Sequence, residues 1–172
     1  WLSKANTTLK GKLNGDVLVV RDTLNNKFYS DMISSNLMLN NSDFGALNLS
    51  FDYDDTKDIQ IIQGHTSIDD KKAIEFSGDY NSLVDSNNMH VTVDVNDFNL
   101  SHINTYLPFF DPLKGLLTGH LNVYGHINEP TLEGDFIAND VYLTVPYLNV
   151  DLKSNGESNL NLGHDIIELN NF

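Results

Sequence analysis

Cysteine is absent from this chain of 172 residues, and basic residues are few. Without cysteine, disulfides and thiolate metal sites are excluded, and the redox compartment stays undecided. Ten Lys and Arg residues stand against 24 Asp and Glu residues, which gives a net charge of −14. Nucleic-acid binding needs clustered basic side chains, so the composition argues against it, and it disfavours an anionic membrane surface for the same reason.

Long hydrophobic runs are also missing. No run approaches the roughly 18 apolar residues of a membrane-spanning helix, and no charged and then apolar leader opens the chain. The sequence begins at Trp1 and stops at Phe172, just after the strand-like run 166–169. We therefore expect it to be a segment of a longer protein.

Apolar and polar residues alternate over short stretches that are separated by clusters of Asn, Asp, Ser and Gly, with 47–53, 74–80 and 89–95 as clear examples. A period of two is typical of strands with one buried face. The sequence predicts an all-β, mainly antiparallel fold, with 1–172 forming a single β-rich segment. Strands are expected near 8–21, 27–33, 35–40, 45–53, 58–68, 72–80, 88–96, 116–127, 131–138, 140–145, 147–154 and 165–170.

Two stretches depart from this alternation. Residues 99–107 place Leu100, Ile103 and Leu107 on one helical stripe, so we expect one short helix there that covers an end of the sheet. The strand 59–68 changes phase at Ile61-Ile62, and a β-bulge at that point would reconcile its two halves.

No catalytic or metal-binding motif stands out. The Asp-rich run 52–58 resembles a calcium loop but has Lys57 and Gln63 where that loop needs glycine and glutamate. His120 and His126 share a strand face but lie roughly 20 Å apart, too far to bind one ion. There is no Gly-x-Ser-x-Gly elbow and no phosphate-binding glycine loop. We expect no enzyme activity, no cofactor and no metal.

One phrase occurs twice: residues 9–19 read LKGKLNGDVLV and residues 113–123 read LKGLLTGHLNV. The spacing predicts two sub-repeats that start near 9 and 113. Glycine weakens a strand interior and is found where a sheet bends or another group comes close. We expect six glycines of these regions to curve the sheet: Gly11, Gly15, Gly115, Gly119, Gly125 and Gly134.

The apolar positions of the strands are the remaining functional candidate. A lining of aliphatic side chains without convergent polar groups suits acyl chains, which need burial and little orientation. A closed β-sandwich or jelly roll that recognises glycan or protein through its loops is the alternative, and there the same residues would be core. The predicted groove residues are Leu13, Val17, Phe76, Val91, Val93, Val95, Leu117, Leu121, Val123, Ile127, Leu132 and Phe136.

Residues 113–136 carry a resemblance to a known family. A Gly-x-Leu-x-Gly strand at 115–119 is followed by a second Gly-x-Ile at 125–127, by Pro130 two residues before a leucine, and by Gly134. The predicted helix and the run 107–110 lie just ahead of this pattern. The order of these features resembles the TamB family, within the wider AsmA-like group.

The resemblance implies an envelope protein anchored in the inner membrane of a Gram-negative bacterium, with this chain as a periplasmic segment. Its sheet would be curled and elongated, a β-taco with an apolar inner groove. The groove would shield phospholipid acyl chains, or nascent outer-membrane β-strands, between the two membranes. The full-length protein would work with a TamA- or BamA-type outer-membrane protein. We also expect a homodimer through edge strands, because unpaired strand edges associate readily.

Overall fold

The computed structural model describes residues 8–21, 25–40, 42–107, 109–154, 156–163 and 166–170. Most of them lie in β-strands, and the two helical elements among them are short 3₁₀ helices, η2 (Leu100–Tyr106) and η3 (Pro146–Leu148). The strands are β1 (Leu9–Lys10), β2 (Asn14–Arg21), β3 (Asn26–Ser34), β4 (Met38–Leu39), β5 (Ser42–Asp43), β6 (Ala46–Asp54), β7 (Ile59–Ile68), β8 (Lys71–Asn81), β9 (Met89–Asn99), β10 (Leu113–His126), β11 (Glu129–Val145), β12 (Val150–Lys153), β13 (Glu157–Leu162) and β14 (Ile167–Asn170).

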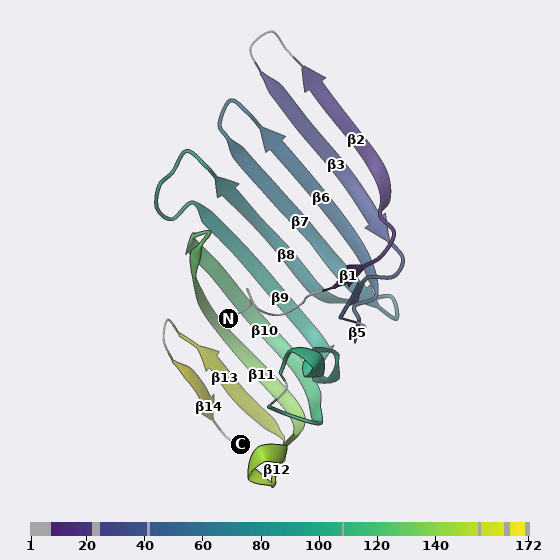
Figure 1. The fold of residues 1–172 in the computed structure, drawn as a ribbon, viewed down its shortest axis with the longest axis vertical. Helices are drawn as coiled ribbons and strands as arrows, with labels where there is room; N and C mark the ends of the chain where they lie inside the picture. The colour runs from purple at the N-terminus through teal and green to yellow at the C-terminus, as the bar shows by residue number, and fades with distance from the viewer. Residues whose placement is uncertain are drawn as a thin grey trace.

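Eleven strands form one antiparallel sheet in which most neighbours follow one another along the chain; the exceptions are the pairs β3-β6 and β11-β13. The order runs β14-β13-β11-β10-β9-β8-β7-β6-β3-β2, and β12 pairs with β11 beside β13. Figure 1 shows this meander as a single broad layer from β2 to β14. The predicted all-β, mainly antiparallel fold is confirmed. The sheet is open and uncurled, so the β-taco stays a prediction.

A second, three-stranded sheet has the order β1-β4-β5; in the chain, β4 and β5 lie between β3 and β6, whereas β1 precedes β2. This small sheet and η2 lie together at one end of the long strands (Figure 1). Asn99 caps η2 by accepting a hydrogen bond from the Ser101 backbone N–H at 3.0 Å. Where the sequence predicts a short helix over 99–107, the chain therefore makes a 3₁₀ helix.

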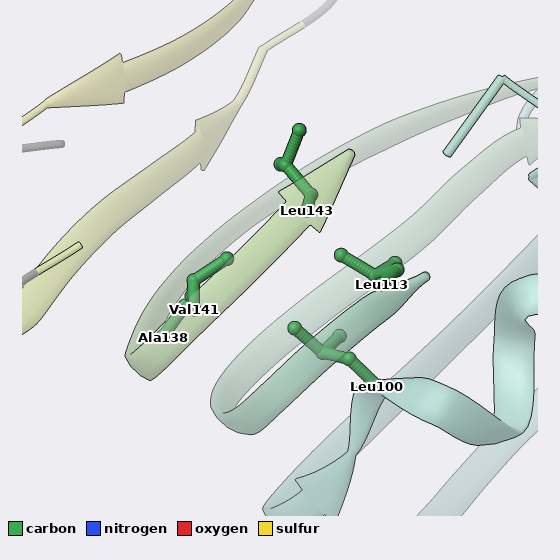
Figure 2. Close-up of a cluster of buried hydrophobic side chains, with 5 residues drawn as sticks. All are labelled: Leu100, Leu113, Ala138, Val141 and Leu143. Atoms are coloured by element: carbon green, nitrogen blue, oxygen red, sulfur yellow. The ribbon is translucent and has the colours of Figure 1, made fainter. Parts of the chain in front are cut away.

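The buried core gathers at that same end, which we call the capped end. It consists of two clusters, and Ile103 of η2 packs against both. The first cluster contains Phe44, Ala73 and Phe98. The Phe44 and Phe98 rings lie 5.7 Å apart between centroids. Figure 2 shows the second cluster, in which Leu100 of η2 faces side chains of β10 and β11: Leu113, Ala138, Val141 and Leu143.

Four predictions about the strands need correction. Ile61 pairs with Asp79 and Ile62 with Gly78 without interruption, so the predicted bulge there is wrong; the irregularity in this pair lies between Thr66 and Ser67. Residues 157–162, with no predicted strand, form β13, and the predicted strands 131–138 and 140–145 are one continuous strand, β11. The expected strand at 147–154 begins only at residue 150, after η3.

Candidate functional site: the apolar face of the sheet

The register of the sheet places apolar side chains of neighbouring strands directly opposite one another. Phe76 of β8 pairs with Val93 of β9, which in turn pairs with Leu121 of β10. Successive residues of a strand point to opposite faces, so each such row lies on one side of the sheet. We call this side the apolar face; its members are Val17, Val19, Phe28, Met32, Leu47, Leu49, Phe51, Tyr53, Ile62, Ile74, Phe76, Tyr80, Met89, Val91, Val93, Val95, Phe98, Leu117, Leu121, Val123, Leu132, Phe136, Ala138, Leu160 and Leu162.

The opposite side, which we call the polar face, carries the alternate residues of the same strands. One transverse row runs through Asn48, His65, Glu75, Asp94 and His120 on five consecutive strands. The sheet therefore has one apolar and one polar side over most of its width, as expected for a sheet with one side in water.

Ten of the twelve predicted groove residues lie on the apolar face. The other two do not: Leu13 precedes β2, and Ile127 lies in the turn between β10 and β11. The prediction also omitted members such as Met32, Leu49 and Ile62. Their alternation was visible in the sequence, but only the register shows that they extend the same surface.

Most of the apolar face has no cover in the part of the chain that the structure describes. Its buried hydrophobic clusters lie at the capped end, most of its other members are half-buried, and Val17, Ile62 and Leu132 are exposed. Scattered exposed apolar residues are normal on a protein surface, but contiguous apolar patches mark interaction sites. This continuity makes the apolar face the candidate binding surface.

Four glycines of the apolar face, Gly64, Gly78, Gly119 and Gly134, lie beneath or beside larger side chains. A Cβ built on Gly64 would lie 2.8 Å from Cζ of Phe76. Cβ atoms on Gly119 and Gly134 would lie 2.6 Å and 3.0 Å from the ring of Phe136. Absence of a side chain at these positions lets both rings lie close to the sheet, as in the pairing of aromatic residues with strand glycines.

The remaining predicted glycines occupy other settings. Gly115 has φ +134° at the register shift between Lys114 and Leu116, a conformation that glycine adopts most readily. Gly125 has φ +108° within β10, and Gly11 lies between β1 and β2. Gly15 faces the apolar side opposite Met32. A role for these glycines in curving the sheet stays a prediction.

The sheet has a hollow on each side. On the apolar face, a shallow hollow of about 180 Å³ is lined by Phe51, Gln60, Ile62, Tyr80, Met89 and Val91, with Asp79 at its border. On the polar face, a hollow of about 600 Å³ crosses the strands from β2 to β9 and is lined by groups such as Asn48, Gln63 and Thr92. The larger hollow therefore lies on the polar face, where apolar groups such as Ile33 also line it, and the sequence did not indicate it.

Electrostatic contacts of the polar face are local. His120 Nδ1 lies 2.8 Å from a carboxylate oxygen of Asp94, and its Nε2 lies 3.1 Å from Asn122 Oδ1. The hydrogen bond to Asp94, followed by that to Asn122, raises the pKa of His120. The contact with Asp94 joins β9 and β10, and the contact with Asn122 lies within β10.

The carboxylates of the Asp-rich turn 54–58 bind side chains and backbone groups of the turn itself and of the neighbouring strands. Asp54 accepts from the Thr56 backbone N–H at 3.1 Å and lies 3.1 Å from Lys27 Nζ, while Asp58 accepts from the Tyr53 hydroxyl at 3.0 Å. Hydrogen bonds from the Thr56 side chain and from Lys27 lower the pKa of Asp54 to about 2. These bonds are those of a solvated hairpin turn. Among the described residues, no three His, Asp or Glu side chains come together as a possible metal site.

No protein-family profile, curated protein or solved structure matches this chain. Within the described ranges, no helix has the length and apolar character needed to span a membrane.

Proposed function

We propose that this chain is a non-enzymatic lipid-shielding domain whose apolar face covers the acyl chains of phospholipid. The supporting observation is the continuity of the apolar face across the sheet, together with the lack of a second layer over it among the described residues. An apolar surface of this extent gains stability when it is removed from water. Each methylene that it buries contributes about 0.8 kcal/mol, so the affinity should depend on chain length without a sharp optimum.

The hydrogen bonding of this face favours acyl chains over nascent β-strands. The backbone groups of its interior strands pair within the sheet, and one polar side chain on this face, Ser30, donates from its Oγ to the Phe51 carbonyl at 3.4 Å. A peptide strand needs backbone hydrogen bonds, which a sheet offers only at its edges. An acyl chain needs none, so it is the cargo that the face suits better.

The resemblance to the TamB family extends this proposal to the full-length protein. There the chain would be a periplasmic segment of an inner-membrane-anchored protein of a Gram-negative bacterium. Its open sheet would curl around the lipid, so that the apolar face becomes the inside of a groove. The full-length protein would deliver its cargo to a TamA- or BamA-type protein in the outer membrane.

A matched pair of substitutions on β9 tests the lipid proposal. Val93→Asp places a carboxylate on the apolar face. Thr92→Asp changes the adjacent residue and places a carboxylate on the polar face. The assay is photo-crosslinking to a phosphatidylethanolamine with a photoreactive acyl chain, with thermal unfolding of each variant as the check on folding.

We expect Val93→Asp to lower crosslinking by about tenfold or more, because a charge against hydrocarbon is strongly unfavourable. Thr92→Asp should crosslink like the unchanged chain. Equal crosslinking of both folded variants would contradict an acyl-chain site on the apolar face.

The hollow on the polar face supports a second candidate function, recognition of glycan or protein. Its amide and hydroxyl side chains suit a hydrophilic ligand, although the sheet does not form the closed sandwich first considered for this function. The same two variants separate the candidates. Thr92 lines this hollow, so Thr92→Asp should weaken binding of a polar ligand, whereas Val93→Asp should leave it unchanged.

A further inference from the structure

The edge of the large sheet at β2 is open in the described part of the chain. β2 pairs with β3 on one side, and no described strand lies on its other side. All eight of its residues are exposed, including the four consecutive apolar residues 17–20. Outward-facing backbone N–H and C=O groups of an edge strand can pair with another strand.

β2 differs from the interior strands because it is apolar on both sides. Val17 and Val19 belong to the apolar face, while Leu18 and Val20 point to the polar face, where Leu18 pairs with the exposed Tyr29. A strand that is apolar on both sides is typical of a covered position within a sheet. Residues 17–20 also lack the charges, proline or bulge that protect exposed edges.

The opposite edge is smaller. β14 pairs with β13 over only four residues, whereas β2 pairs with β3 over eight. Short edge strands are one of the ways in which proteins prevent edge association. The longer and more apolar edge is therefore the docking candidate.

We propose that β2 docks on β2 of a second copy of this chain, and that the two strands pair antiparallel. A two-fold axis perpendicular to the sheet keeps both apolar faces on the same side. If this axis passes beside Leu18, Val17 of one copy lies opposite Val19 of the other. The edge is self-complementary because its middle is uncharged and apolar on both sides. The pairing concerns the edge alone, so it holds whether or not the apolar face binds lipid.

The charge of the chain gives this association a recognisable salt dependence. Each copy carries a net charge of −14, so two copies repel one another, while the contact itself has no charge within 17–20. Salt screens the repulsion over roughly 8 Å at about 0.15 M. Dimerisation through β2 should therefore strengthen as salt is raised.

Sedimentation velocity over a concentration series tests the proposal on three forms of the chain. The first is unchanged, the second carries Leu18→Lys and Val20→Lys, and the third is a control with Ile61→Lys. Ile61 points to the same face as Leu18 and is similarly exposed, 45% against 59%, but it lies on an interior strand. Thermal unfolding confirms that each form is folded.

We expect the unchanged chain and the control to form dimers, and the β2 variant to dimerise at least about tenfold more weakly, because lysines on an edge oppose pairing. Amide hydrogen exchange should slow in β2 as the dimer forms. A monomeric unchanged chain, a control weakened as much as the β2 variant, or assemblies larger than dimers would each overturn the proposal.

Discussion

The capped end and the uncovered middle of the sheet belong to the same apolar face, yet they differ in burial. Phe98 at the capped end is 4% exposed, while Ile62 in the middle is 36% exposed. Ile62 reaches this face through the alternation of β7, and Phe98 reaches it after the register shift between β9 and β10. Alternation and register decide only the side to which a residue points. The cover comes from the small sheet, made of β1 and of the two strands between β3 and β6, and from η2 between β9 and β10. Patterning therefore makes the face, and connections between strands decide which part of it becomes core.

Alanine substitution at these two positions should give the largest contrast. Phe98→Ala removes a buried ring that contacts Phe44 and His102, and should lower the free energy of unfolding by about 3–5 kcal/mol. Ile62→Ala should cost about 1 kcal/mol, since this side chain is already partly exposed to water. Urea unfolding of the two variants measures the difference. Similar losses would show that the middle is as well packed as the capped end.

A smaller effect is expected from filling a glycine beneath an aromatic ring. In Gly64→Ala, the added methyl would meet the Asn48 carbonyl and the ring of Phe76, and should cost about 1–3 kcal/mol by overpacking. Gly163→Ala is the matched control, because its added Cβ would have a nearest neighbour at 3.8 Å. If both substitutions left the urea midpoint unchanged, the packing of Phe76 against the sheet would not depend on glycine at position 64.

The smallest effect concerns the polar face and its pH dependence. The bond to Asp94 raises the pKa of His120 above its ordinary value of 6.5, so protonated His120 stabilises the folded state. This contribution is complete below pH 6.5 and is lost as the pH rises through the raised value. For an exposed pair it amounts to about 0.5 kcal/mol or less.

The difference between the urea unfolding midpoints at pH 5.5 and pH 8.5 should therefore become smaller in His120→Asn. Asp94→Asn should reduce this difference by the same amount. An undiminished pH dependence in both variants would assign it to other groups.

The sequence predicted the strands with strong alternation and the side to which their residues point, because period two depends only on local backbone geometry. β13 escaped prediction because Leu160 and Leu162 alternate with asparagines, which are depleted in strands. Ile61 misled the bulge prediction: it is an apolar residue on the polar face, not a change of phase. The full extent of the apolar face depends on register, which joins residues far apart in the sequence and could not be predicted strand by strand.

The order of strands in the large sheet also has a consequence for folding. Each strand pairs with neighbours that are close along the chain, so contacts form by closing short loops, and such topologies fold faster than sandwiches with distant pairings. Interactions extend from strand to strand in one dimension, as in repeat proteins. Stability is then approximately a sum of hairpin terms, and a hairpin at either end of the sheet can open while the strands around η2 stay folded.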